Sequence, residues 1–150
     1  MISAEPIFSI RCELANILDL GPAPFGHRRV VNILGGTVSG PKFSGRILPG
    51  GADWQIVAAD GTIDLHARYT AESDAGALVQ VDSRGLRSGP PDVLARLGRG
   101  EDVDPSLYYF RTVMRFATAH ADTQWMNCIL ALARGAREKN AVRLDVHEVL

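Results

Sequence analysis

The chain has few cysteines, no excess of charge of either sign and no metal-ligand spacing. It contains 2 cysteines in 150 residues, and its formal net charge is -1. This balance gives no electrostatic reason to expect nucleic acid or an acidic membrane as a partner. Cys12 and Cys128 stand far apart in apolar segments and lack C-x-x-C spacing. We therefore expect two buried free thiols and no metal site or redox pair.

Long apolar runs are also missing. Nowhere does the sequence reach the roughly 18 consecutive apolar residues of a membrane-spanning helix. Residues 1–20 are interrupted by charges and a proline, unlike the core of a signal peptide. We therefore expect a cytoplasmic protein with no membrane partner. A length of 150 residues with 46% hydrophobic content predicts a single domain spanning residues 1–150.

The signatures of several large enzyme classes are absent. The chain has no G-x-G-x-x-G after a strand, no Walker A loop, no G-x-S-x-G and no H-E-x-x-H. Nucleotide-dependent chemistry, serine hydrolysis by that route and zinc proteolysis therefore have no support. His27, His120 and His147 are too scattered for a metal site. The sequence predicts neither a cofactor nor a metal.

Strand-like patterns fill most of the chain. Alternating or β-branched segments occur at Phe8–Leu14, His27–Val38, Trp54–Ala58, Ile63–Ala71, Ala77–Leu86, Tyr108–Thr118, Trp125–Arg134 and Val142–Leu150. Turn signals separate them, and Asp60–Gly61 is a strong hairpin signal. One stretch differs, because Pro90–Asp92 begins a short helix predicted over 91–97.

These strands must stack as a sandwich or close as a barrel. Closure removes the exposed edges that long strands would otherwise present. Nine of the 15 glycines fall between Gly21 and Gly61, which suits strands that bend sharply, although ordinary hairpin turns explain them equally well. We predict an all-β fold, a closed antiparallel β-barrel of about 8 to 10 strands of the calycin or lipocalin type. A barrel of this size can hold one small ligand.

An ordered set of short motifs spans about Ile7 to Val149. It comprises Gly35-Gly36, Gly40-Pro41, Pro49-Gly50-Gly51-Ala52-Asp53-Trp54, Ala67-Arg68-Tyr69, Gly76-Ala77, Gly85, Tyr109-Phe110-Arg111 and Trp125-Met126-Asn127. The set resembles the signature of domain-of-unknown-function family three-two-three-seven, an uncharacterised family of small bacterial and fungal proteins. The resemblance implies a closed antiparallel β-barrel and little about chemistry. His66 stands where the family usually carries an aspartate.

Four residues are candidates for catalysis. Asp53 can act as a base or an orienting carboxylate, and His66 as an acid or base. Tyr69 can donate a hydrogen bond to a carbonyl, and Arg111 can hold a carboxylate or enolate. Strand parity sets limits on this set, because His66 and Tyr69 lie on opposite faces of one strand. Arg111 falls on the more polar face of its strand, which favours an external salt bridge, and Asp53 equally suits an Asx turn.

Four further residues are candidates for binding a substrate. Trp54, Phe110 and Trp125 offer flat apolar walls, and Asn127 offers an amide that donates and accepts. Trp125 also fits a plain core position. The whole set suits a cofactor-independent isomerase, lyase or cyclase that moves a proton on a small aromatic or carboxylate metabolite. The alternative is a non-catalytic carrier of a small apolar ligand, and an exposed strand edge would permit a homodimer.

Overall fold

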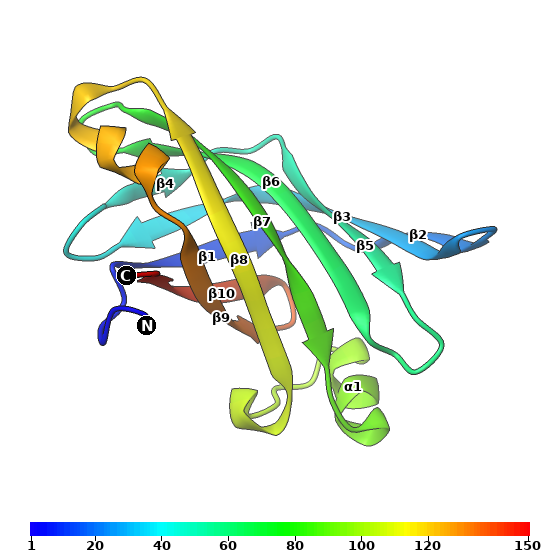
Figure 1. The fold of residues 1–150 in the computed structure, drawn as a ribbon. Helices are drawn as coiled ribbons and strands as arrows, with labels where there is room; N and C mark the ends of the chain where they lie inside the picture. Colours follow the sequence, from blue (N-terminus) through cyan, green and yellow to red (C-terminus); the bar gives the residue numbers. More distant parts are fainter.

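Ten strands form one antiparallel sheet that closes on itself in the computed structural model, which describes residues 1–150 (Figure 1). The prediction of a closed antiparallel barrel is confirmed. The strands are β1 Phe8–Leu14, β2 Leu18–Ala23, β3 Gly26–Ser39, β4 Gly45–Ile47, β5 Gly51–Val57, β6 Ile63–Ser73, β7 Leu78–Ser88, β8 Tyr109–Thr118, β9 Ala131–Arg137 and β10 Ala141–Glu148.

The long strand β3 organises the ring. One edge of β3 pairs with β1 and then β2, and its other edge pairs with β4 and then β5. On each side of β3, two short strands therefore occupy one position of the ring together. Strands β6 to β10 complete a ring of eight positions. The ring closes where β1 pairs with both β3 and β10. The hairpin of β2 and β3 extends beyond the barrel wall (Figure 1).

The seam between β1 and β3 depends on two consecutive glycines. A Cβ at Gly36 would collide with the backbone carbonyl oxygen of Arg11 on β1. Gly35 has a φ of +145° and lies where the β1–β3 register shifts between Glu13 and Leu14. At this seam the glycines therefore allow a close backbone approach and a bulge, as expected for strands that bend to close a barrel.

Aromatic and sulfur side chains fill the barrel end remote from helix α1 (Pro91–Gly98). The ring centroid of Phe8 lies 5.8 Å from that of Phe43 and 5.9 Å from that of Phe116. Met114 and Met126 are fully buried in the same core. The opposite end of the barrel, beside α1, is left for a cavity.

The helix predicted over 91–97 is confirmed as α1, which lies at one end of the barrel (Figure 1). It buries Val93 and Leu97. A turn of 3-10 helix, η1, follows at Pro105–Leu107. None of these helices combines the length and the hydrophobicity of a membrane-spanning segment.

The strand predicted for Trp125–Arg134 is partly wrong. Residues Ala121–Cys128 form a second 3-10 helix, η2, and strand β9 begins only at Ala131. Two side chains stabilise the helical path: His120 accepts a hydrogen bond from the backbone N–H of Asp122, and Asn127 pairs with the backbone of Thr118. The expectation that Cys128 is buried is therefore wrong, because it lies exposed at the end of η2, whereas Cys12 is buried as predicted.

The prediction also missed two strands. β2 has mostly exposed side chains and contains Gly21-Pro22, which suggested a turn. β4 has only 3 residues. Both segments form strands because they pair with β3. The alternation of residues within a segment does not indicate which other segment it pairs with.

Candidate functional site

A cavity of about 280 Å³ lies inside the barrel at the end beside α1. Of the 26 residues that line it, 13 are hydrophobic, and the others are polar residues and two glycines. Three segments lie at its mouth: the β1–β2 link (Ala15–Ile17), the C-terminal end of α1 (Leu97–Gly100) and the β9–β10 turn (Lys139–Asn140). The cavity is thus formed by the barrel and bordered by its connections.

Strand alternation decides which side chains reach this cavity. Successive side chains of a strand point to opposite faces, so every second residue enters the barrel. The contributions of β3, β5 and β6 are Arg29, Val31, Ile33, Asp53, Gln55, Leu65, Ala67 and Tyr69. On these three neighbouring strands, Arg29, Asp53 and Gln55 form a polar wall of the cavity, beside apolar residues such as Val31 and Leu65.

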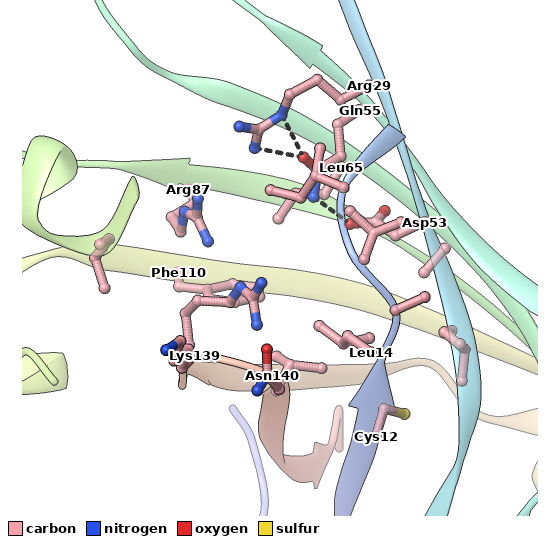
Figure 2. A pocket seen from close by; sticks show the side chains of 18 of the residues that line it. Cys12, Leu14, Arg29, Asp53, Gln55, Leu65, Arg87, Phe110, Lys139 and Asn140 are labelled. Atoms are coloured by element: carbon pink, nitrogen blue, oxygen red, sulfur yellow. Dashed lines mark hydrogen bonds between the residues drawn. The ribbon is translucent and has the colours of Figure 1, made fainter. Parts of the chain in front are cut away.

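A chain of hydrogen bonds orients Asp53 (Figure 2). The guanidinium of Arg29 donates from Nε (3.1 Å) and Nη2 (2.6 Å) to the side-chain oxygen of Gln55. The amide nitrogen of Gln55 then donates to Oδ2 of Asp53 at 2.8 Å. Because Arg29 engages the amide oxygen, the amide N–H groups must face the carboxylate. Oδ2 is thereby fixed, and Oδ1 is the free oxygen of Asp53.

Four buried polar atoms have no hydrogen-bond partner within the chain, and all four belong to residues that line this cavity. They are Oδ1 of Asp53, Oη of Tyr69, Nε of Arg87 and Oγ1 of Thr112. Buried polar groups in native proteins are normally paired, and exceptions often mark functional sites. The concentration of unpaired atoms in one cavity therefore identifies it as a candidate site for a polar ligand.

The cavity carries an excess of positive charge. Arg29, Arg87 and Arg137 line it, with Asp53 as its single carboxylate. Burial, followed by the nearby charges of Arg137 and Arg29, lowers the pKa of Arg87 to about 10. Burial also raises the pKa of Asp53 above its ordinary value, although the hydrogen bond from Gln55 opposes this. The site thus favours a bound anion over further cations.

Three of the predicted site residues line the cavity: Asp53, Tyr69 and Phe110. Asp53 lies within strand β5 and points into the barrel, so it does not cap the preceding turn. Tyr69 is buried, and burial raises the pKa of its hydroxyl well above the ordinary value. It therefore keeps its proton and can donate a hydrogen bond to a ligand.

The other two catalytic candidates lie outside the cavity, as strand parity indicates. His66 faces outward and its Nε2 lies 3.2 Å from Oδ2 of Asp82. The departure from the family pattern at His66 therefore does not reach the cavity. Arg111 also faces outward, where its guanidinium lies 5.2 Å from the ring centroid of Tyr109 and donates to the carbonyl of Phe110. Neither side chain converges with Asp53.

Three binding candidates also lie elsewhere. Trp54 is 49% exposed and alternates with the inward-facing Asp53 and Gln55. Trp125 lies on η2, where the amine of Lys42 is 5.5 Å from its ring centroid. The side chain of Asn127 forms hydrogen bonds with the backbone of Thr118 in the same region and does not line the cavity. These three residues contribute to the surface and the far end of the barrel.

The sequence interpretation missed the residues that give the cavity its charge: Arg29, Gln55, Arg87, Thr112 and Arg137. Strand parity would have identified Arg87. Arg87 lies on the same face of β7 as the buried Val79, Val81 and Ser83, but the predicted strand ended one residue earlier, at Leu86. A polar residue in register with a buried apolar face is the pattern to seek.

Comparison with known proteins places this architecture in a family. The chain matches the family model described as "Protein of unknown function (DUF3237)" over residues 2–149. The chain belongs to this family. The resemblance found in the sequence motifs is thereby confirmed. Among DUF3237 relatives, a UPF0311 protein from Rhodopseudomonas palustris is 43% identical over 149 residues, covering 99% of this chain and 97% of the relative. A UPF0311 protein from Clostridium acetobutylicum is 39% identical over 146 residues, covering 97% and 92%.

Solved structures share the barrel. A conserved protein of unknown function from Rhodopseudomonas palustris has a TM-score of 0.92 and 41% identity, covering 100% of this chain and 98% of that one. A β-barrel like protein from Acinetobacter baumannii has a TM-score of 0.85 and 38% identity, covering 99% and 96%. An enzyme from Penicillium herquei has a TM-score of 0.72 at 19% identity, covering 99% and 95%, and shares the fold alone.

Proposed function

We propose that this DUF3237 protein is a cofactor-independent enzyme that transfers a proton on a small aromatic or carboxylate metabolite, as an isomerase, lyase or cyclase. The observation that carries the proposal is Asp53, a carboxylate that lines the cavity and whose buried Oδ1 has no hydrogen-bond partner within the chain. A proton acceptor needs such a free oxygen within reach of a substrate.

The surroundings of Asp53 suit it as a general base. Burial raises the pKa of its carboxyl group, which makes the ionised form a stronger proton acceptor than an exposed aspartate. Gln55 donates to the other oxygen, Oδ2, at 2.8 Å, which leaves Oδ1 as the oxygen without a hydrogen bond. A base held in one orientation loses little freedom when the substrate binds.

The cavity also holds hydrogen-bond donors that can stabilise the negative charge that develops on a substrate. When Oδ1 takes a proton from a carbon beside a carbonyl group, the C–H electron pair moves into the new C=C bond and the carbonyl oxygen becomes an enolate. The hydroxyl of Tyr69 and the guanidinium of Arg87 line the same cavity and have unpaired donors. Donors fixed before the reaction stabilise such an oxyanion strongly in a site sheltered from water. Returning the proton at another atom completes an isomerisation.

The polarity of the cavity favours catalysis over simple transport. A carrier of an apolar ligand requires apolar walls and one polar anchor. Here a carboxylate, a phenol, two aliphatic hydroxyls and four guanidinium groups line one cavity.

Proton exchange tests the proposal without knowledge of the natural substrate. The probe is para-acetylbenzoate in deuterium oxide, and loss of its acetyl proton signal is followed by NMR. Asp53→Asn should slow the protein-catalysed exchange by about 100-fold, since general base catalysis contributes on that order. Asp64→Asn is the matched control, because Asp64 lies on the exposed face of β6. It should leave the exchange unchanged.

The same experiment distinguishes the carrier. Binding of the probe is measured independently as a rise in melting temperature. If the probe binds to the wild-type protein but exchanges no faster than with Asp53→Asn, the enzyme proposal is refuted and the carrier is favoured.

A further inference from the structure

Building on the proposed function, we infer that the cavity takes an elongated organic carboxylate in one orientation. Arg87 holds the carboxylate near the mouth, and a carbonyl or hydroxyl oxygen lies at the inner end beside Asp53 and Tyr69. The inference adds a ligand class and a binding direction to the proton transfer proposed above.

Arg87 is the residue of the cavity best suited to bind an anion. It is only 7% exposed, and its Nε has no partner in the folded chain. A buried charge is normally paired, because taking it out of water is costly. The one carboxylate in the cavity, Asp53, is already held by Gln55. A ligand carboxylate would supply the missing partner, since its two oxygens match the planar fork of a guanidinium.

The sheet register separates this cation from the base. Arg87 pairs with Ile63 of β6, whereas Asp53 pairs with Ala67 on the other side of the same strand. The two backbone positions therefore differ by four residues along β6, roughly 13 Å at about 3.3 Å per residue. The long side chain of Arg87 spans part of that distance.

One wall between the two groups is apolar, and Gln55 and Arg29 lie on a polar wall beside it. Figure 2 shows Arg87 and Asp53 on opposite sides of the cavity, with Leu65 between them in this view and Phe110 along one wall. A ligand that reaches both ends can therefore pack an apolar middle part against Leu65 and Phe110. An aromatic ring with a carboxylate at one end and a carbonyl at the other has this shape.

The position of the mouth sets the direction of binding. Arg87 lies one residue before the end of β7, next to α1, and Tyr69 lies deeper along β6. Arg99 and Lys139 also line the cavity near its opening. Positive charge at an entrance attracts anions and raises their local concentration. The neutral end of the ligand would therefore enter first, and the carboxylate would stay with the cations at the mouth.

Three rigid probes test the assignment by isothermal titration calorimetry. Para-acetylbenzoate carries both polar groups, para-methylacetophenone lacks the carboxylate, and para-isopropylbenzoate lacks the carbonyl. We expect the wild-type protein to bind para-acetylbenzoate at least tenfold more tightly than either of the others, since each of the others lacks one hydrogen-bonding group at an end of the cavity.

Variants assign each end of the probe. Arg87→Gln should abolish the preference for para-acetylbenzoate over para-methylacetophenone, and Tyr69→Phe should reduce the preference over para-isopropylbenzoate. Arg84→Gln is the matched control, because the Arg84 side chain lies on the outer face of β7 and is 69% exposed. It should keep both preferences. Melting curves of each variant establish that it is folded.

The outcomes separate this inference from the proposed function. If the wild-type protein shows no carboxylate preference, or binds none of the probes, the ligand class is wrong. A preference that survives Arg87→Gln in a folded variant also overturns the inference. If the preference depends on Arg87 but Asp53→Asn does not slow proton exchange, only the proposed proton transfer fails.

Discussion

Replacing Arg87 with methionine should make the ligand-free protein more stable. Arg87 is buried, and its pKa is lowered to about 10 by burial and by two neighbouring arginines. For a base, a lowered pKa means that the folded state disfavours the charged form. The displacement from the ordinary value of arginine corresponds to about 3 kcal/mol, at about 1.4 kcal/mol per pKa unit. This cost applies at every pH below about 10 and declines only as Arg87 loses its proton.

Methionine keeps an unbranched apolar side chain in place and removes the charge. We therefore expect the free energy of unfolding at pH 7 to rise by up to about 3 kcal/mol, and the melting temperature by roughly 6 to 12 °C for a chain of this size. Urea unfolding followed by circular dichroism measures the first quantity. Arg84→Met, on the exposed face of the same strand, should change it by less than about 0.5 kcal/mol. Destabilisation by Arg87→Met would refute the view that Arg87 is kept for binding at a cost in stability.

Two further changes test the electrostatics and the architecture. Because burial raises the pKa of Asp53, its ionised form costs stability at neutral pH, and this cost disappears as the pH falls through the raised value. Asp53→Asn should therefore be more resistant to urea than the wild type at pH 7 and lose this advantage toward about pH 4; a difference independent of pH would contradict the assignment. Gly36→Ala should cost about 3 kcal/mol or more by forcing β1 away from β3. Gly98→Ala, where a Cβ meets no atom within 4 Å, should have no such effect, and equal melting temperatures for both variants would refute the role of the seam.

Local pattern was sufficient to predict most strands and part of the site. The alternation in β6 correctly separates the outward His66 from the inward Tyr69, because side-chain direction follows from parity alone. The helix α1 was likewise predictable from its proline start and apolar spacing. Asp53, expected just before a strand, and Phe110, expected on one, were both named as candidates and do line the cavity.

The remaining features depend on pairing between distant segments. Strand β2 exists because β3 continues beyond β1 and offers a free edge, which the exposed β2 sequence does not indicate. The relay from Arg29 to Asp53 joins residues 24 positions apart through Gln55. Such contacts are defined only when the register of neighbouring strands is known. The cluster of arginines was missed for the same reason.

The seam between β1 and β10 has a consequence for how this protein is made. It pairs Phe8 with Val146 and Glu13 with Ala141, so the first and last strands are direct neighbours. During synthesis, the β10-facing edge of β1 has no partner until residues 141–148 have left the ribosome. Until then the growing chain is an open sheet with two unprotected edges, which is the form most prone to aggregation. Closure of the barrel and formation of the binding cavity are thus a single late event, and a truncated chain that lacked β10 would lack both.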